Sequence, residues 1–550
     1  MPTIYQFIRM NWNTTICLNK THTINKDDMK ITVYNILLLI LVILVSCEDK
    51  NVDGDFVTAE VFPFSMTLEK DTEHYGLWLE IIDKADMRAS LNSFGQFTFF
   101  VPNNEAVTAW LGSNSIDNLT KEEAVTLVRN HMVNEVIESV DYREGCVQDT
   151  NLIGDYLAVS FGDDGFNTII LNHHSTIVHK DIELLNGVMH EVDQVIAPHQ
   201  ETVYDYVVNT SQLSILKEAL QQTGLIDKLK VIEEVNKYDI TRRKYNTVMA
   251  IADTTFNRLG IQSYDDLKAK YSTESDVTDK NNGLNKWVRY HVLYGAYFTS
   301  SMLDYDEMAD AVNLESYCLG EGIQITESRG RIRINYNEVV DGEEVTEEYT
   351  SILKEQRNIP MKNGCVQYVN TLLDITPLKP AWVDFDPTNV NNTSVLPHWA
   401  ANKAWVYSNW IYDEVEPGEI EEWNWETFPE QTTMRYVICN GWFYNNAAVW
   451  FDIGNNDGGY FEVESPLVAK GKYRIKVYDR RWKGGGTFKI YIDGKYITTQ
   501  NQYYGAGDII GAPAWINGIE FEDTKKHTFR IEYKEGNSGF IFGRVSFEPV

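Results

Sequence analysis

The sequence contains the same local patterns twice, about 150 residues apart, and this repeat restricts the fold more than any other feature. Residues 97–107 are typical of a buried strand that leads into a helix, with Asn103 or Asn104 positioned to cap the helix. Residues 245–256 repeat this pattern, with Asp253 in the cap position. The chain is therefore expected to form the same strand-to-helix unit twice.

Two more pairs of segments match in the same order. Residues 128–131 (Val-Arg-Asn-His) match residues 288–291 (Val-Arg-Tyr-His). Residues 181–187 and 358–364 each hold a polar residue and an isoleucine, followed at the same spacing by Asn-Gly, a strong turn signal. Three matches in one order are difficult to explain by chance, so the sequence predicts two copies of one domain.

A third region differs in composition. After a linker at 379–397, residues 398–550 hold nine of the 14 tryptophans. Apolar and polar residues alternate with a period of two in several short segments there, and Asp493-Gly494 is a hairpin signal. The alternating segments are 473–478, 487–492, 527–533 and 540–545. This pattern favours an antiparallel β-sandwich of the jelly-roll kind.

The repeated segments resemble the fasciclin domain family. Residues 97–106 resemble its first signature, and residues 186–193 resemble its second. The resemblance covers 58–198 and 201–378, although the second copy lacks the Pro-Asn pair, carries Gln367 in place of His190, and is longer by about 28 residues between the signatures. It implies an α+β wedge, in which helices pack on one side of a β-sandwich. Residues 398–550 are similar to galactose-binding-like sandwiches, which include many carbohydrate-binding modules. The expected chain is multidomain: two fasciclin-like wedges followed by an antiparallel β-sandwich.

The N-terminal region has the pattern of a secretion signal. An apolar run at 31–45 is shorter than the ~20 residues that a membrane-spanning helix needs, but it suits a signal peptide. Residues 44–47 (Leu-Val-Ser-Cys) resemble a bacterial lipobox, which implies cleavage after residue 46 and lipid attachment to Cys47. A plain signal peptide with an incidental cysteine is the alternative. We expect translation to start at Met29 and residues 47–57 to form a lipidated linker.

The residues after Cys47 indicate where in the cell the protein is located. Glu48-Asp49 resembles the acidic export tag of Bacteroidetes-type surface lipoproteins. The resemblance implies a lipid-anchored protein of the outer membrane that faces the cell exterior. The net charge of −32, without a basic stripe, disfavours nucleic acid and electrostatic docking on anionic lipid.

Sequence marks of catalysis and metal binding are weak. The chain has no nucleophile elbow, no phosphate-binding loop and no zinc-type cysteine pair, so we expect no enzyme and no cofactor. A glycosidase-like carboxylate pair stays an alternative. Residues 452–459 (DIGNNDGG) could hold a structural Ca²⁺, although a tight turn is the simpler interpretation. His173, His174 and His179 are interpreted as a solvent-facing strand edge. The remaining cysteines are expected to be small buried residues.

The candidate contact residues form two groups. The fasciclin resemblance implies adhesion contacts at Asp181, Ile182, Tyr290 and His291; the alternative is that the repeated histidines are buried and structural. Loop geometry implies a second group. In an antiparallel meander the loops 480–486, 501–513 and 535–538 emerge at one end, and 493–495 at the other. The three gathered loops carry the predicted ligand-binding residues Trp482, Tyr503, Tyr504 and Asn537.

Aromatic rings beside amide groups suit sugars, because the C–H face of a sugar stacks on a ring while amides bind its hydroxyls. Rings that seal the sandwich end are the alternative. The sequence thus favours a non-catalytic surface lipoprotein that binds extracellular glycan or matrix, as an accessory to polysaccharide capture. Protein–protein adhesion through the fasciclin-like copies is one alternative, and an enzyme with a carboxylate site in the last domain is another.

Overall fold

The computed structural model describes most of the chain from residue 61 onward, and residues 61–550 form one compact unit. The described residues are 61–93, 95–147, 149–235, 241–302, 311–341, 344–385, 405–407, 410–415, 425–427, 433–438, 447–452, 459–481, 485–502, 509–537 and 539–550. The expected signal peptide, Cys47 and the calcium loop at 453–458 lie outside them. Among the helices of the described ranges, none has both the length and the apolar character needed to cross a membrane.

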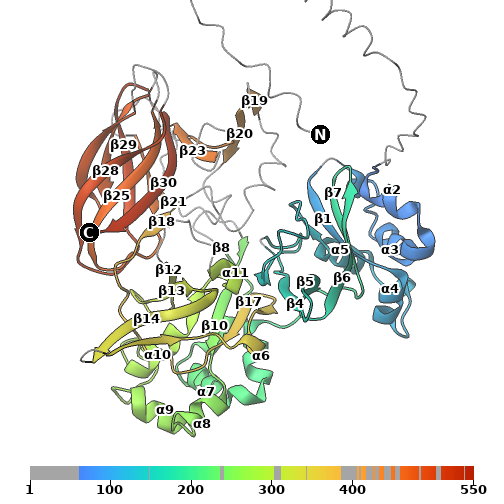
Figure 1. Cartoon of the computed structure of the whole chain (residues 1–550), viewed down its shortest axis with the longest axis horizontal. Coiled ribbons are helices and arrows are strands. Elements are labelled where there is room, and N and C mark those ends of the chain that lie inside the picture. Colours follow the sequence, from blue (N-terminus) through green and yellow to red (C-terminus); the bar gives the residue numbers. More distant parts are fainter. Residues whose placement is uncertain are drawn as a thin grey trace, which may run out of the picture. The chain divides into compact units, whose positions relative to one another are not determined.

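The first repeat is built on one seven-stranded sheet in the order β2-β1-β7-β6-β5-β4-β3. Strands β1 and β7 run parallel, and the other neighbours are antiparallel. Helices cover one face (Figure 1). The elements are α2 (Phe64–Glu69), α3 (Thr72–Lys84), β1 (Phe97–Pro102), α4 (Asn104–Leu111), α5 (Lys121–Asn130), β2 (Met132–Val133), β3 (Gly145–Cys146), β4 (Ala158–Gly162), β5 (Gly165–Leu171), β6 (Ser175–Leu184) and β7 (Gly187–Val192).

Local sequence signals explain where these helices begin. Asn103 caps α4, since its side chain accepts a hydrogen bond from the Ala106 amide at 2.9 Å, as the sequence predicts. Thr120 and Glu123 form a complete capping box at the start of α5. The β1 strand is buried on both faces from its second residue onward, which agrees with its mainly apolar sequence.

The second repeat uses a shorter sheet in the order β11-β10-β17-β16, again with one parallel pair, β10 and β17. A separate four-stranded antiparallel sheet follows in the order β12-β13-β14-β15. The elements are α6 (Val203–Asn209), α7 (Ser214–Gln222), β8 (Glu233–Val235), β9 (Thr241–Arg243), β10 (Asn246–Ala250), α8 (Asp253–Arg258), α9 (Tyr264–Tyr271), α10 (Gly283–Tyr290), β11 (Val292–Tyr294), α11 (Thr299–Met302), β12 (Val312–Glu315), β13 (Gly322–Ser328), β14 (Arg331–Asp341), β15 (Glu344–Thr350), β16 (Ile359–Met361) and β17 (Gly364–Tyr368).

The prediction that Asp253 caps the helix that follows it is wrong. Asp253 is the first residue of α8, and Ala252 occupies the cap position. The Asp253 carboxylate instead accepts hydrogen bonds from the Ser214 and Ile215 amides, both at 3.0 Å, at the start of α7. A cap supplied from another segment cannot be read from local spacing.

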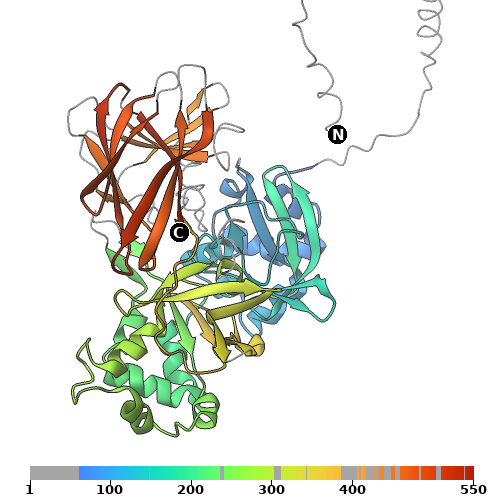
Figure 2. The same cartoon turned by 60° about the vertical axis from the view of Figure 1, so that its left-hand side comes forward.

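The C-terminal region consists of two antiparallel sheets that share one core (Figure 2). The larger sheet follows the order β19-β20-β22-β23-β30-β25-β28, with β18 beside β30, and the smaller follows β21-β24-β29-β26-β27. The strands are β18 (Val383–Phe385), β19 (Trp405–Tyr407), β20 (Trp410–Val415), β21 (Trp425–Thr427), β22 (Thr433–Ile438), β23 (Ala447–Asp452), β24 (Tyr460–Glu464), β25 (Gly471–Arg481), β26 (Thr487–Ile492), β27 (Lys495–Asn501), β28 (Ile509–Phe521), β29 (Thr528–Glu535) and β30 (Gly539–Pro549).

Alternation explains this core. In β26 every second residue is buried, and Phe488 and Ile490 point inward. They meet Phe529, Ile531 and Phe547 from neighbouring or facing strands. The four alternating segments coincide with β25, β26, β29 and β30, apart from His527, which precedes β29, so the prediction of a β-sandwich is confirmed for the described strands.

Candidate functional site

The two repeats use the same residues to close the parallel strand pair. In the first, the Asn186 side chain accepts from the Phe64 amide at 3.1 Å and donates to the Leu91 carbonyl at 2.8 Å. In the second, the Asn363 side chain accepts from the Val203 amide and donates to the Leu229 carbonyl, both at 2.9 Å. The two Asn-Gly segments therefore anchor the N-terminal part of each repeat to its sheet.

The predicted adhesion pair in the first repeat has a local structural role. Asp181 is exposed but has a left-handed backbone, with φ of 58°. Its carboxylate accepts hydrogen bonds from the Ser139 amide at 2.7 Å and from the Ser139 hydroxyl. Ile182 is half-buried against the hydrophobic core of the first repeat. Asp181 thus ties the 139 loop to the sheet, and only part of this pair faces solvent.

The predicted adhesion pair in the second repeat does not reach the surface. Tyr290 and His291 are both 0% exposed. The Tyr290 hydroxyl donates to the Gly322 carbonyl at 2.8 Å, and the His291 Nδ1 lies 2.8 Å from the Trp287 carbonyl oxygen. Burial lowers the pKa of His291 to about 4, so the ring is neutral near pH 7. We correct the contact role to a structural one, which the sequence left open as the alternative.

The histidine cluster of the first repeat belongs partly to a buried carboxylate that the sequence did not reveal. Glu191 has a side-chain exposure of only 2%, yet four side chains donate to or share a proton with it. The partners are His74 Nε2 at 2.9 Å, Tyr75 Oη at 2.9 Å, Asn103 Nδ2 at 2.9 Å and His179 Nδ1 at 2.7 Å. Only the clustering of histidines near residues 173–179 hinted at such a site.

The protonation state of this carboxylate follows from its contacts. Burial by itself raises the pKa of Glu191, but the hydrogen bonds from Asn103, His179 and His74 lower it overall. Among the described residues, no group of three metal-binding side chains converges here or elsewhere. The cluster holds β7 to α3 and β6, and it supplies no open coordination site.

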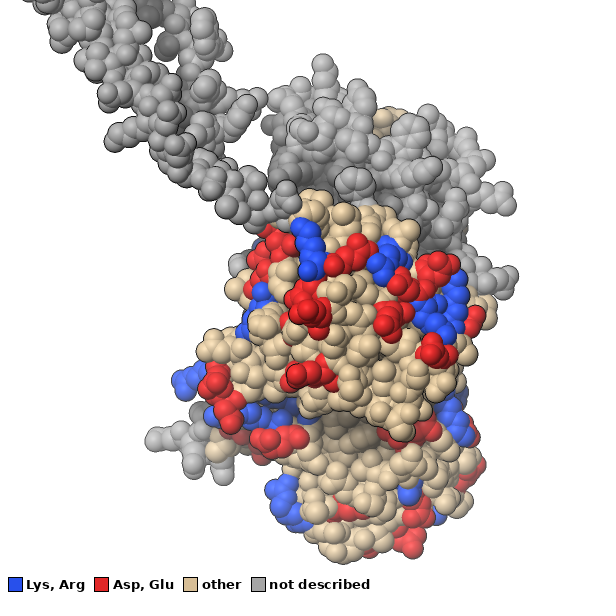
Figure 3. Space-filling model, turned by 90° about the vertical axis from the view of Figure 1, so that its right-hand side faces the viewer, with Lys and Arg blue, Asp and Glu red and all other residues tan. Residues whose placement is uncertain are grey.

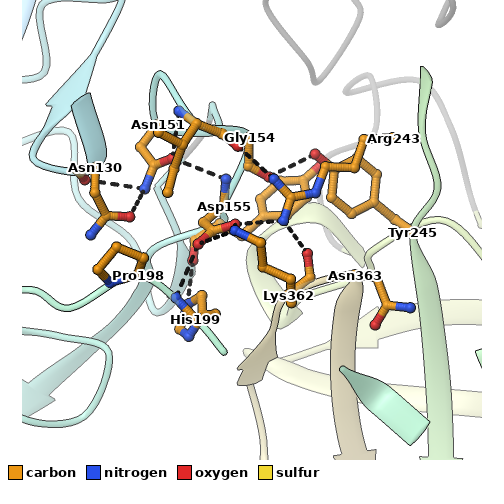
Figure 4. Close-up of polar contacts among 12 residues, drawn as sticks. Asn130, Asn151, Gly154, Asp155, Pro198, His199, Arg243, Tyr245, Lys362 and Asn363 are labelled. Atoms are coloured by element: carbon orange, nitrogen blue, oxygen red, sulfur yellow. Dashed lines mark hydrogen bonds and ion pairs between the residues drawn. The ribbon is translucent and has the colours of Figure 1, made fainter. Parts of the chain in front are cut away.

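A second buried carboxylate joins the two repeats (Figure 4). Asp155 precedes β4, and its side chain is 0% exposed. Arg243 Nη2 lies 2.6 Å and Lys362 Nζ 3.0 Å from Asp155 Oδ1, and the His199 amide donates to Oδ2 at 3.1 Å. Arg243 and Lys362 belong to the second repeat, so one buried anion from the first repeat is neutralised by two cations from the second.

The described parts of the three predicted sandwich loops do meet. The Gln502 amide donates to the Gly486 carbonyl at 2.8 Å, and a Cβ atom added to Gly486 would lie 2.0 Å from the Asn537 carbonyl oxygen. Asn537 is exposed, and its Oδ1 accepts from the Gly539 amide at 2.8 Å. The expected loop 501–513 is shorter than predicted, because β28 begins at Ile509.

Three of the four predicted ligand-binding residues lie outside the described residues. They are Trp482, Tyr503 and Tyr504. At the opposite end of the sandwich, in the turn at 493–494, Asp493 Oδ2 contacts Lys525 Nζ and His527 Nδ1, both at 2.9 Å. The exposed ring near this end is Tyr496, which is 52% exposed.

Charge is distributed without a dominant patch on the face shown in Figure 3. Acidic and basic side chains alternate across that face, and tan surface separates them. The three described cysteines Cys146, Cys318 and Cys365 are buried and free, as expected.

Comparison with known proteins identifies one family. Residues 74–198 match the model of the fasciclin domain. "Protein sll1483" of Synechocystis sp. is 28% identical over 130 residues, which cover 23% of this chain and 68% of that protein. Human periostin is 22% identical over 152 residues, which cover 27% of this chain but only 18% of periostin.

Two solved structures overlap with parts of the chain. One is a FAS1 domain pair from the insect cell adhesion molecule fasciclin I, at 14% identity and a TM-score of 0.26, covering 54% of this chain and 96% of that one. The other is a CBM36 carbohydrate-binding module in complex with calcium and xylotriose, at 8% identity and a TM-score of 0.17, covering 30% and 99%. These scores are too low to establish a shared fold. The family match shows that this multidomain chain contains a fasciclin domain over residues 74–198.

Proposed function

We propose that this protein is a non-catalytic binding protein of the cell exterior, whose C-terminal sandwich binds glycan through the loops at one of its ends. The observation that carries the proposal is the convergence of three loops, at the contacts of Gly486 with Gln502 and Asn537. These loops hold Trp482, Tyr503 and Tyr504 in the sequence. Aromatic and amide side chains projecting from one place are the chemistry that sugars require.

The remainder of the chain would act as a support for that sandwich. We propose that residues 201–378 form a second fasciclin domain, because β10 and β17 pair in the same parallel register as β1 and β7. The Asp155 ion pairs join the two repeats, and Lys526 of the sandwich lies 2.5 Å from Glu315 of the second repeat. Because the domains are joined, they would hold the glycan-binding end of the sandwich away from the membrane to which the N-terminus is attached.

Attachment through a lipid on Cys47 completes the proposal. The support is the lipobox-like sequence at 44–47 and the acidic pair that follows it. Mass spectrometry of the membrane fraction should find a diacylglycerol-modified N-terminal peptide that begins at Cys47. The Cys47→Ser variant should lack the modification and appear in the soluble fraction; an unmodified native peptide would contradict the anchor.

A glycan array with the full chain tests the binding function. Trp482→Ala and Tyr504→Ala should each abolish binding to the glycan that the native protein selects. Tyr496→Ala is the matched control, because it removes an exposed ring from the opposite end of the same sandwich. Equal loss in the control, or no binding to any glycan, would contradict the proposal, and product release from a polysaccharide would favour an enzyme.

Protein adhesion through the fasciclin domain is the second candidate. The observation in its favour is that Phe166 on β5 and Val178 on the neighbouring strand β6 are 74% and 43% exposed. Large exposed apolar side chains on adjacent strands are typical of protein contact surfaces. If adhesion is the function, Phe166→Ser should reduce attachment of protein-coated beads to cells, while Trp482→Ala should leave it unchanged.

A further inference from the structure

A cavity lies where the two repeats meet, separate from the ion pairs of Asp155. Its volume is about 460 Å³, within the range of small-molecule sites. The segment 135–147, between β2 and β3, forms most of the wall, and Ser300 and Ser301 of α11 close it from the second repeat. Residues of both repeats line this space.

The wall is held in place before any ligand arrives. The Thr98 hydroxyl donates to the Glu135 carbonyl at 2.6 Å and accepts from the Ile137 amide at 2.9 Å. The Cys146 amide donates to Ser300 Oγ at 3.0 Å, which ties the wall to α11. A preformed cavity loses little conformational entropy when it binds a ligand.

Two polar atoms of the wall are buried and have no hydrogen-bond partner among the described residues. They are the hydroxyl of Tyr142, a residue that is only 3% exposed, and the Oε2 atom of Glu135. Both residues line the cavity. Buried polar groups almost always have partners, since leaving one unpaired is costly. A ligand that donates hydrogen bonds would supply the missing partners.

The charge of the wall indicates what kind of donor fits. Glu135 and Asp141 are acidic, and Arg143 is the one basic residue that lines the cavity. Arg143 is exposed, and none of the ion pairs between described residues joins it to either carboxylate. Burial raises the pKa of Glu135, and the negative charge of Asp141 raises it further, as expected of a carboxylate that no cation among the described residues neutralises.

The rest of the wall is apolar. Val136 and Val140 are 38% and 82% exposed, respectively, and Val147 is buried beside them. An apolar surface next to an uncompensated carboxylate complements a molecule that combines an aliphatic chain with a positive end group.

We propose that this cavity binds a primary alkylammonium group, with the ammonium at Glu135 and Tyr142 and the aliphatic chain against Val136 and Val140. The group can belong to a free organic amine or to the lysine side chain of a partner protein. In either case the ammonium pairs with the Glu135 carboxylate, and the Tyr142 hydroxyl oxygen is a second acceptor of the wall. The site is independent of the proposed glycan-binding end.

Calorimetric titration of the full chain tests this assignment. The probes are n-pentylamine and the neutral 1-pentanol, which share a chain length and differ in charge. We expect pentylammonium to bind and pentanol to bind at least tenfold more weakly, because a hydrogen bond to a charged group is stronger than one between neutral groups. Equal affinity for the two probes, or binding of neither, would overturn the proposal.

Three variants locate the site. Glu135→Gln keeps the shape and removes the charge, and should weaken pentylammonium binding about tenfold. Tyr142→Phe should weaken it by about threefold and should still fold, because its hydroxyl makes no intramolecular hydrogen bond. Glu138→Gln is the control, since Glu138 is exposed in the same segment and does not line the cavity. Unchanged binding in Glu135→Gln and Tyr142→Phe would overturn the assignment.

The source of the ammonium is decided by a third probe, N-acetyl-lysine methylamide. Binding as tight as that of pentylammonium supports a lysine side chain of a partner protein. Binding of pentylammonium alone supports a free amine, because the amide groups of a peptide would then be excluded from the cavity.

Discussion

The two repeats share the same backbone conformation beside their parallel strand pair, namely a glycine with positive φ and a left-handed residue before it. They differ in the polar side chains that this backbone carries. Gly187 and Gly364 have φ of 146° and 140°, and each packs directly on the first residue of the neighbouring parallel strand. Asp181 and Asn358 are both left-handed, with φ of 58° and 55°. Where the first repeat has the buried Glu191, however, the second has Tyr368 in the same register position.

The hydrogen bonds of the two left-handed residues show that this backbone conformation accepts different side chains as its hydrogen-bond acceptor. The Asp181 amide donates to His190 Nδ1 at 3.2 Å, whereas the Asn358 amide donates to Gln367 Oε1 at 2.9 Å. A histidine and a glutamine thus provide the same acceptor. The comparison teaches that the backbone restricts geometry and hydrogen-bonding capacity at such positions, and leaves the chemical identity of the side chain free to vary.

The largest effect is expected where the repeats join. Asp155→Ala would leave Arg243 and Lys362 partly buried without their anion, and should lower the free energy of unfolding by about 4 kcal/mol. Calorimetry should then resolve two unfolding transitions. Asp227→Ala, which removes an exposed pair with Lys230, should leave the free energy of unfolding nearly unchanged. A single transition at nearly the native temperature would show that the repeats are not coupled through Asp155.

Replacing the glycine that packs on the parallel strand should destabilise both repeats equally. In Gly187→Ala and Gly364→Ala the new Cβ would lie 1.9 Å from the Phe97 carbonyl oxygen and 1.8 Å from that of Asn246. Each should lose about 3 kcal/mol in chemical denaturation.

Gly165→Ala and Gly330→Ala are matched controls, since both glycines have positive φ but open space around them. Each should cost about 1 kcal/mol. If the first pair costs no more than the controls, the close strand contact does not explain the repeated glycine.

Acidification should destabilise both repeats through their matching histidines. Burial lowers the pKa of His131 and of His291 to about 4, from the usual 6.5. The unfolded chain therefore binds protons first as the pH falls, and stability is lost between about pH 6.5 and 4 and levels off below that. Each histidine should cost about 2 kcal/mol by pH 5.

Denaturation at several pH values measures this slope. His291→Phe should reduce it by the amount that one proton contributes, about 1.4 kcal/mol per pH unit at its steepest. The two histidines differ in one respect: His131 Nε2 accepts from the Ile196 amide at 3.0 Å, whereas His291 Nε2 has no hydrogen-bond partner among the described residues. An unchanged slope in the variant would mean that His291 titrates normally.

The smallest effect is expected at the position where the repeats diverge. Glu191→Gln should cost about 1.5 kcal/mol, because it weakens hydrogen bonds to a charged acceptor. Tyr368→Phe should cost about 0.5 kcal/mol, since the Tyr368 hydroxyl has only long contacts of 3.3 Å with Tyr206 and Gln212. Equal losses in the two variants would show that the hydrogen bonds to Glu191 stabilise the first repeat no more than those of Tyr368 stabilise the second.

Features that depend on neighbouring residues were readable from the chain. The capping box at Thr120 and Glu123 involves residues three apart, and the turn at Asp493-Gly494 involves adjacent ones. The helix α5 nevertheless ends at Asn130, although apolar residues continue at helical spacing to Met132 and Val136. Periodicity indicates that a helix forms more reliably than it indicates where the helix ends.

The candidate sites were less accessible to such reasoning. Asp155 lies 88 residues from Arg243 and 207 from Lys362 in the sequence, and nothing local marks either residue as its partner. Glu191 likewise takes its four partners from three separate segments: α3, the residue before α4, and β6. Each of these sites exists because tertiary packing brings distant segments together.

Local physics, acting within a few residues, thus sets the repeated strand-to-helix units, the caps and the alternating strands of the sandwich. Burial and ionic partners arise only when the chain is folded. Packing placed Tyr290 and His291 in the interior, directed the Asp253 carboxylate to the start of another helix, and formed a cavity lined by both repeats. The physical reason is range: backbone propensity and periodicity act along the chain, whereas desolvation and charge neutralisation act through space.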